Sequence, residues 1–128
     1  MTGFVENLFG LKGRVAAVSG GGGYLCGELA RGLARAGCRV AVMDIRLGTA
    51  EDGASQIWAE LGGDAIGVEV DASDKASFRA GLAATLDAFG QADILINGAG
   101  INAPTPFLEI ELDEFHAVMN SQITSTLL

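Results

Sequence analysis

Short apolar runs alternate with longer amphipathic stretches along the chain. Four runs have the length of buried strands and are bounded by turn residues; they span residues 15–18, 40–43, 65–70 and 94–96. Between and after them, apolar residues recur every three or four positions, which predicts helices; these apolar stripes span 25–36, 50–61, 78–89 and 112–127. Strands that alternate with helices and lack a polar face are typical of a parallel sheet covered on both sides. The pattern predicts one α/β domain over residues 1–128, a doubly wound parallel sheet with right-handed crossovers.

Several local features give more detailed expectations. The apolar segment 4–11 is expected to cover one end of the sheet. Thr49 and Asp52 have the spacing of a capping box at the start of the second helix. Trp58 lies on the apolar stripe of that helix, so it is expected in the core rather than stacked on a ligand. The two prolines within residues 101–109 exclude an α-helix there and favour an extended loop.

The stretch from the first strand to the end of the second combines a glycine turn with an acid. Gly20–Gly23 follow the first strand, a helix begins near Leu25, and the second strand ends on Asp44. Strand, glycine turn, helix, strand and acid is the order of parts in a dinucleotide-binding unit. The glycines let a pyrophosphate approach the main chain, and the helix start presents unpaired N–H groups to it.

Asp44 also bears on the choice of cofactor. Its carboxylate would accept hydrogen bonds from ribose hydroxyls and repel a 2′-phosphate, which favours NAD over NADP, although Arg46 could soften that preference. The alternative is a glycine-rich turn without a ligand, because Leu25 and Cys26 stand where the strict G-x-G-x-x-G spacing needs glycine. A phosphate-binding P-loop is excluded, because Glu28 occupies the position of its lysine.

Composition and charge narrow the range of partners. The net charge of −8 argues against nucleic acid as a partner. No apolar run approaches the roughly 18 residues of a membrane span, and the N-terminus lacks the basic start and apolar stretch of a signal peptide. A cytoplasmic protein without membrane contact is therefore expected. Cys26 and Cys38 have neither metal-ligand nor redox spacing, so they are expected to pack in the interior, and no metal site is predicted. The single histidine, His116, lies on the polar side of the last helix and is expected in solvent.

Two motifs resemble the short-chain dehydrogenase/reductase family. That family writes its phosphate loop as T-G-x-x-x-G-x-G; the dipeptide Ser19–Gly20 matches its start, whereas Tyr24 and Cys26 replace the second and third glycines. Tyr24 is tolerable there only if its φ is negative. Residues 97–100 resemble the family's N-N-A-G motif, with Gly98 in place of the second asparagine. The loop form G-G-G-G-x-L-C is similar to the branch that reduces keto sugar acids, the fructuronate/mannonate type.

The resemblance implies a Rossmann-type fold, truncated after the fourth strand and its following helix, in an NAD(P)-dependent oxidoreductase of secondary alcohols and ketones. Its substrate would be a small molecule, a sugar acid such as fructuronate or mannonate being one option, and the full-length protein would be a homo-oligomer. The implied cofactor-binding residues are Ser19, Gly20, Gly22, Gly23, Tyr24, Leu25, Asp44, Ile45, Arg46, Asp71, Ala72, Asn97, Gly98, Ala99 and Gly100. Asp71 has two equally weighted roles, contact with adenine together with Ala72 or capping of the next helix. The amide of Asn97 could tie neighbouring strands together.

The catalytic part of the family pattern is missing. The only tyrosine is Tyr24, and Glu28 stands four residues later, so there is no Tyr-x-x-x-Lys. Because the family's serine, tyrosine and lysine normally lie beyond this point, residues 1–128 are expected to lack the catalytic part and to be inactive alone. Gln122 falls at the family's relay-asparagine position, keeping the amide but adding a methylene.

Two other classes of function stay open at this point. One is a non-catalytic nucleotide-binding module or degenerate paralogue, for which the missing motif would be genuine. The other is a methyltransferase-like protein, which would place an acid near Ser19. The strand at 94–96 is also expected to lack a neighbour on one side, which requires either more chain or another chain to cover its edge.

Overall fold

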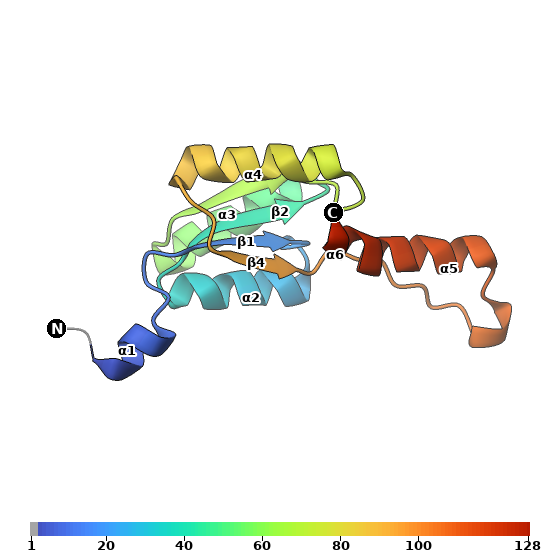
Figure 1. Cartoon of the computed structure of the whole chain (residues 1–128), viewed down its shortest axis with the longest axis horizontal. Helices are drawn as coiled ribbons and strands as arrows, with labels where there is room; N and C mark the ends of the chain where they lie inside the picture. The colour runs from blue at the N-terminus through green and yellow to red at the C-terminus, as the bar shows by residue number, and fades with distance from the viewer. Residues whose placement is uncertain (1–2) are drawn as a thin grey trace.

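The computed structural model describes residues 3–128 and contains a four-stranded parallel sheet (Figure 1). Its strands are β1 (Val15–Ser19), β2 (Arg39–Asp44), β3 (Ala65–Glu69) and β4 (Ile94–Asn97), in the order β3-β2-β1-β4. The central strand β1 pairs with β2 on one side and β4 on the other, and β2 pairs with β3, all in parallel. All carboxyl ends therefore meet at one edge of the sheet.

Helices cover both faces of this sheet. The main ones are α2 (Tyr24–Arg35), α3 (Leu47–Leu61) and α4 (Lys75–Phe89). Alternate residues of β1 and β2 point to opposite faces. Ala16 and Val18 pack in one cluster with residues of α2 and α3, while Ala17 packs in another, against which Phe78 and Phe89 of α4 lie. The predicted Rossmann-type, doubly wound sheet is confirmed.

The helix α2 approaches the sheet through its small side chains. Cys26, Ala30 and Ala34 are buried, whereas Leu25 is 72% exposed. The leucine periodicity thus locates the helix but not its buried side. Small residues face the sheet because they let the helix backbone lie close to the strands.

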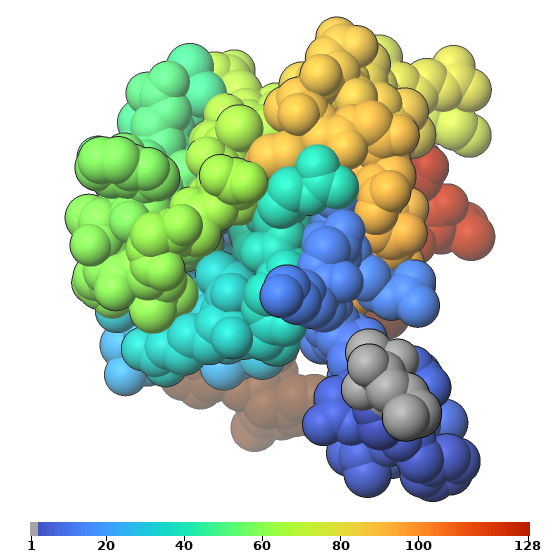
Figure 2. All heavy atoms as spheres, turned by 90° about the vertical axis from the view of Figure 1, so that its left-hand side faces the viewer, coloured from blue at the N-terminus to red at the C-terminus, as the bar shows by residue number. Residues whose placement is uncertain are grey.

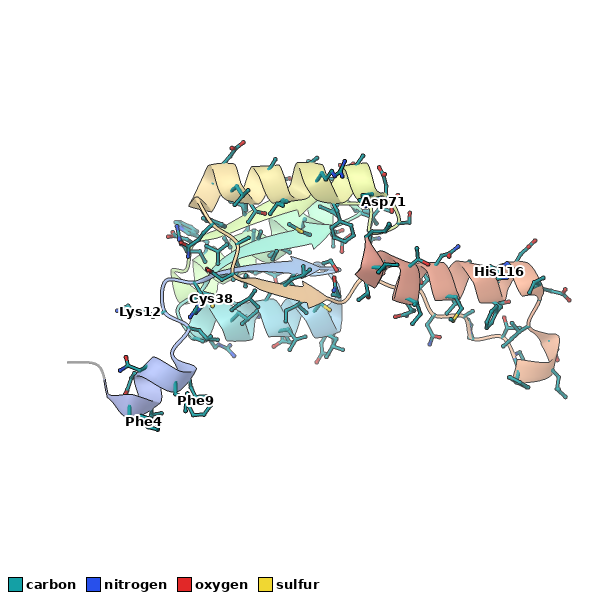
Figure 3. The ribbon with its side chains drawn as sticks, viewed as in Figure 1. Phe4, Phe9, Lys12, Cys38, Asp71 and His116 are labelled. Atoms are coloured by element: carbon teal, nitrogen blue, oxygen red, sulfur yellow. The ribbon has the colours of Figure 1, made fainter. Side chains whose placement is uncertain are left out.

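The N-terminal segment does not cover the sheet, so that prediction is wrong. Residues Phe4–Phe9 form the short helix α1, whose apolar side chains are exposed; Figures 1 and 2 show it standing clear of the sheet. Figure 3 shows Phe4 and Phe9 on this projecting helix. Only Leu11, after the helix, packs against the core, because Gly10 ends α1 and the chain turns before β1.

Two predictions about α3 are also wrong. The helix begins at Leu47, before Thr49, and no side chain caps its first turn, so the proposed capping box is absent. Trp58 is 70% exposed rather than part of the core. Its neighbour Ile57 is buried instead, and one residue corresponds to about 100° of helix rotation, which turns the indole away from the sheet.

The C-terminal part extends from the body of the molecule. The loop after β4 has no α-helix but contains a 3₁₀ turn, η1 (Phe107–Glu109). The predicted last helix is α5 (Leu112–Met119), a π turn labelled η2 (Asn120–Thr124) and α6 (Ser125–Leu127), and Figure 1 shows α5 pointing away from the sheet.

The outer edge of β4 has no strand partner among residues 3–128, as the sequence predicted. Leu95 of β4 is 57% exposed, so the expectation that both faces of this strand are covered is wrong within the described chain. Leu82 and Leu86, on the apolar stripe of α4, are exposed as well. Together these residues form an apolar surface beside β4.

We predict that Gly67→Ala strongly destabilises the fold. A Cβ on Gly67 in β3 would overlap the backbone nitrogen of Glu51 and lie 2.6 Å from the carbonyl carbon of Ala50, because α3 rests directly on this strand. The expected loss is about 1–3 kcal/mol of unfolding free energy, measured by urea denaturation. The matched control is Gly32→Ala in α2, where a Cβ meets nothing within 4 Å and should stabilise by up to about 1 kcal/mol. Equal effects of the two substitutions would contradict the close helix–strand contact.

Candidate functional site

A cleft of about 430 Å³ opens at the carboxyl ends of the strands. This is where ligands bind in open α/β sheets. The residues that line it are Gly20, Asp44, Ile45, Arg46, Val70, Asp71, Ala72, Ser73, Ala99, Gly100, Ile101 and Ser121. The fold thus brings together segments that follow all four strands.

The glycine turn packs tightly on the ends of the neighbouring strands. Gly20 has a φ of 67°, which favours glycine, and a Cβ there would lie 2.9 Å from the carbonyl oxygen of Gly98. On the other side of the turn, the N–H of Gly21 donates a hydrogen bond of 2.9 Å to the carbonyl of Met43. The turn is therefore fixed against both β2 and β4.

The start of α2 leaves room for an anionic ligand. Its N-cap is Gly23, and no side chain accepts a hydrogen bond from the first-turn amides. The first amides of a helix lack partners within the helix and carry the positive end of its dipole. Tyr24, the first residue of α2, has negative φ and a 91% exposed side chain, so it replaces the family's glycine without backbone strain.

Asp44 lies against the glycine turn at the end of β2. It is only 8% exposed, and its Oδ1 accepts a hydrogen bond of 3.1 Å from the N–H of Arg46. A Cβ on Gly22 would lie 2.8 Å from Oδ2 of Asp44 and 2.5 Å from Cγ2 of Thr49. Gly22 therefore leaves the space that the carboxylate occupies. The guanidinium of Arg46 is 3.9 Å away from Oδ1 and largely in solvent, a weak pairing.

Asp71 lies on the rim of the cleft and does not cap α4. Its Oδ1 accepts hydrogen bonds from the hydroxyl (2.6 Å) and the N–H (2.8 Å) of Ser73, which hold the pKa of the Asp71 carboxyl below its usual value. The N-cap of α4 is Asp74, which accepts from the N–H groups of Ala76 and Ser77. Of the two roles considered for the Asp71 side chain, capping is therefore excluded. Asp71 and Ser121 of the C-terminal π turn line the same cleft, at the end of the sheet where Figure 3 labels Asp71.

Ser19, rather than Asn97, ties the strand ends together. The buried Ser19 hydroxyl accepts hydrogen bonds from the N–H groups of Gly98 (3.2 Å) and Ala99 (3.3 Å). Asn97 is exposed, so the tie expected from its amide is wrong. A hydroxyl on the central strand reaches both amides because β1 and β4 are in register, with Ser19 opposite Asn97.

Gln122 anchors the C-terminal helix to the loop that follows β4. Its Nε2 donates a hydrogen bond of 3.1 Å to the carbonyl of Ile101, and it lies in the π turn η2. One residue earlier, the hydroxyl of Ser121 accepts from the N–H of Ile101 and donates to the carbonyl of Val118. These contacts bring Ser121 to the cleft.

Several predicted site residues do not line this cleft. Ser19 lies beneath it, and Leu25 is exposed on α2. Gly22, Gly23 and Tyr24 line a separate hollow of about 300 Å³ between α2 and α3. The remaining two, Asn97 and Gly98, lie outside the cleft on the β4 side.

Sequence reasoning missed four residues of the cleft. They are Val70, Ser73, Ile101 and Ser121. The D-x-S spacing of Asp71 and Ser73 is typical of an Asx turn and could have indicated one of them. Ser121 gave no such signal, because only the fold of the C-terminal segment brings it there.

The cysteines and acids show no sign of metal chemistry. Burial raises the pKa of the Cys26 thiol, and it raises that of Cys38 as well, so both are neutral packing groups. Within residues 3–128, no three histidine, cysteine or acidic side chains are grouped as metal ligands would be. In the same part of the chain, the helices are too short or too polar to cross a bilayer.

Comparison with known proteins identifies the family. The family model described as short chain dehydrogenase matches residues 14–128. The chain therefore belongs to the short-chain dehydrogenase/reductase family of oxidoreductases and corresponds to an N-terminal portion of its members.

Individual relatives agree with this assignment. The chain is 39% identical over 106 residues to the uncharacterized oxidoreductase UxuB of Bacillus subtilis, covering 81% of this chain and 37% of that protein. It is 32% identical over 123 residues to D-threitol dehydrogenase of Mycolicibacterium smegmatis, covering 94% and 46%. A crystal structure of a short-chain type dehydrogenase/reductase from Mycobacterium marinum superposes with a TM-score of 0.87 at 28% identity, covering 96% of this chain and 48% of that one. The chain spans less than half the length of the curated relatives named here.

We predict that Ser73→Ala raises the pKa of Asp71 toward its usual value of 3.8, because the substitution removes the hydroxyl that stabilises the carboxylate. The folded-state pKa lies below that of the unfolded chain, so this stabilisation is present at neutral pH and is lost as the pH falls through the depressed pKa. NMR titration of the carboxyl carbons measures the change. Asp93 is the control, since its low pKa comes first from the N–H of Val15 and should not move. An unchanged Asp71, or an equal shift of Asp93, would contradict the assignment.

Proposed function

We propose that residues 1–128 form the NAD-binding part of an oxidoreductase that interconverts a secondary alcohol and a ketone. The observation that supports this most strongly is the cleft at the strand ends, where Gly20 of the glycine turn, Asp44 and Asp71 come together. When bound, nicotinamide supplies the hydride chemistry, and the protein supplies position and electrostatics.

The residues of the cleft, together with the neighbouring start of α2 and the end of β4, fit a dinucleotide. The uncapped start of α2, just after Gly23, would hold the pyrophosphate, and the carboxylate of Asp44 would accept hydrogen bonds from the adenosine ribose. Adenine would lie beside Ala72, whose side chain is small. The segment Asn97–Gly100, free of large apolar groups, would border the second ribose.

The preference for NAD over NADP rests on Asp44. A 2′-phosphate would bring like charge against a carboxylate that is almost fully buried, which is unfavourable by several kcal/mol. Arg46 offers a compensating charge, but its side chain is 77% exposed and its Nε lies 3.9 Å from the carboxylate. Its attraction for a phosphate would be screened by solvent.

We propose a polyhydroxylated substrate for the full-length protein. Relatives include proteins named D-threitol dehydrogenase and sorbitol dehydrogenase, both with polyol substrates in their names. The glycine loop resembles that of keto sugar-acid reductases, which makes a sugar acid such as fructuronate or mannonate a second option. The Nε2 of Gln122 donates to the carbonyl of Ile101, which leaves its Oε1 and its second N–H for a relay role.

We also propose that the full-length protein is a cytoplasmic homo-oligomer. The family match supports a small-molecule enzyme. The exposed apolar surface around Leu82 and Leu95 supports contact with a further protein surface, because patches of this kind are typical of protein–protein interfaces.

The cofactor preference can be tested by fluorescence titration of the full-length protein with NADH and NADPH. NADH should bind more tightly, and Asp44→Ala should weaken NADH binding by about 10- to 100-fold, because it removes a charged acceptor. Asp44→Asn should improve NADPH binding, since it removes the repulsion. The charge-matched control is Asp87→Asn on the exposed side of α4, which should change neither affinity. Equal affinities of the parent protein for both cofactors would refute the preference.

Residues 1–128 alone should show no dehydrogenase turnover, because they contain no Tyr-x-x-x-Lys to protonate the substrate oxygen. The measurement is NADH formation with polyols and NADH consumption with keto sugar acids. The full-length gene product, assayed in parallel, is the positive control. A measurable rate from the 128-residue polypeptide would show that another group carries out the proton transfer.

A further inference from the structure

Cys26 of α2 and Gly98, the residue that follows β4, pack against each other beside the cleft. A Cβ on Gly98 would overlap the Sγ of Cys26 and would also lie 3.0 Å from the carbonyl oxygen of Ser19. Both positions depart from the family motifs quoted above, in which glycine stands at position 26 and asparagine at position 98. In this chain the side chain is present at position 26 and absent at position 98.

We propose that these two departures form one compensated exchange, in which the side chain gained at position 26 takes the space of the side chain lost at position 98. Cys26 is then a positioning residue for the end of β4. The thiol of Cys26, which lies on α2, occupies the space that an asparagine side chain at position 98 would need. The effect of this exchange on cofactor binding rests on the function proposed above. The steric coupling between residues 26 and 98 does not.

The contact is held from both sides. Cys26 is 7% exposed and belongs to the core cluster that contains Ala16 and Val18, so its side chain is held in the interior. On the other side, the N–H of Gly98 donates a hydrogen bond of 3.2 Å to the hydroxyl of Ser19, which fixes the strand end. Because protein interiors are close-packed, a side chain added at position 98 would displace its neighbours.

The exchange determines the geometry of the cleft. Ala99, the next residue, lines the cleft, and its N–H is bonded to the same Ser19 hydroxyl. Gly20, on the glycine turn, packs against the same segment, since a Cβ added to Gly20 would lie 2.9 Å from the carbonyl oxygen of Gly98. A side chain added at position 98 would therefore displace the strand end relative to the turn.

The test is a double-mutant cycle in the full-length gene product. Gly98→Ala adds only the Cβ, and Cys26→Ala removes only the Sγ; the Cβ of residue 26 would then lie 3.4 Å from the new Cβ, an ordinary contact. Thermal unfolding reports the steric coupling, and NADH titration reports the positioning. Gly100→Ala is the control, because the three atoms nearest to its Cβ would all belong to the flexible side chain of Gln122 and none to Cys26.

Gly98→Ala alone should lower the midpoint of thermal unfolding and weaken NADH binding by about tenfold or more. In the Cys26→Ala background the same substitution should weaken NADH binding by clearly less than in the parent protein, the remaining effect coming from the 3.0 Å approach to the carbonyl oxygen of Ser19. Gly100→Ala should have the same effect with and without Cys26→Ala. If Gly98→Ala is equally harmful in both backgrounds, or harmless in the parent protein, the exchange is refuted.

The two proposals fail in different ways. A parent protein that binds neither NADH nor NADPH would refute the proposed function, while the thermal unfolding cycle would still decide the coupling. Coupling in thermal unfolding without any coupling in NADH affinity would refute the positioning role of Cys26.

Discussion

The close approach of the glycine turn to the ends of β2 and β4 is the constraint on which the cleft depends. Gly20 touches the backbone at Gly98, and Gly22 makes room for the carboxylate of Asp44. Ser19 holds the β4 end through two amides. These contacts fix the position of the glycine turn relative to the ends of β2 and β4.

Small residues also allow close packing where the helices α2 and α3 meet the sheet. Ala30 and Ala34 bring α2 onto the sheet, and Gly67 brings α3 onto β3. Close contact between helix and sheet places the start of α2 directly behind the glycine turn. The anion-binding role proposed for that helix start therefore depends on this close contact between the layers.

The described chain also presents apolar surface that its own residues leave uncovered. Leu95 on β4 and the leucines of α4 lie open, and β4 has an unpaired edge within residues 3–128. The curated relatives are more than twice as long as the segment they share with this chain. The residues proposed to bind the dinucleotide thus precede the region where the family places its tyrosine and lysine.

The sequence by itself determined the strands, the main helices, their order and the set of residues at the strand ends, because hydrophobic periodicity and glycine turns are local signals. Only the tertiary structure decided which side of each helix is buried, and it exposed Trp58 because the indole points away from the sheet. It also decided that Asp74 rather than Asp71 caps α4, and that Ser19 rather than Asn97 joins the strand ends. The cap depends on the residue at which α4 begins. The Ser19 contacts depend on the register of β1 against β4, which places two distant amides beside one hydroxyl, and no local pattern carries that information.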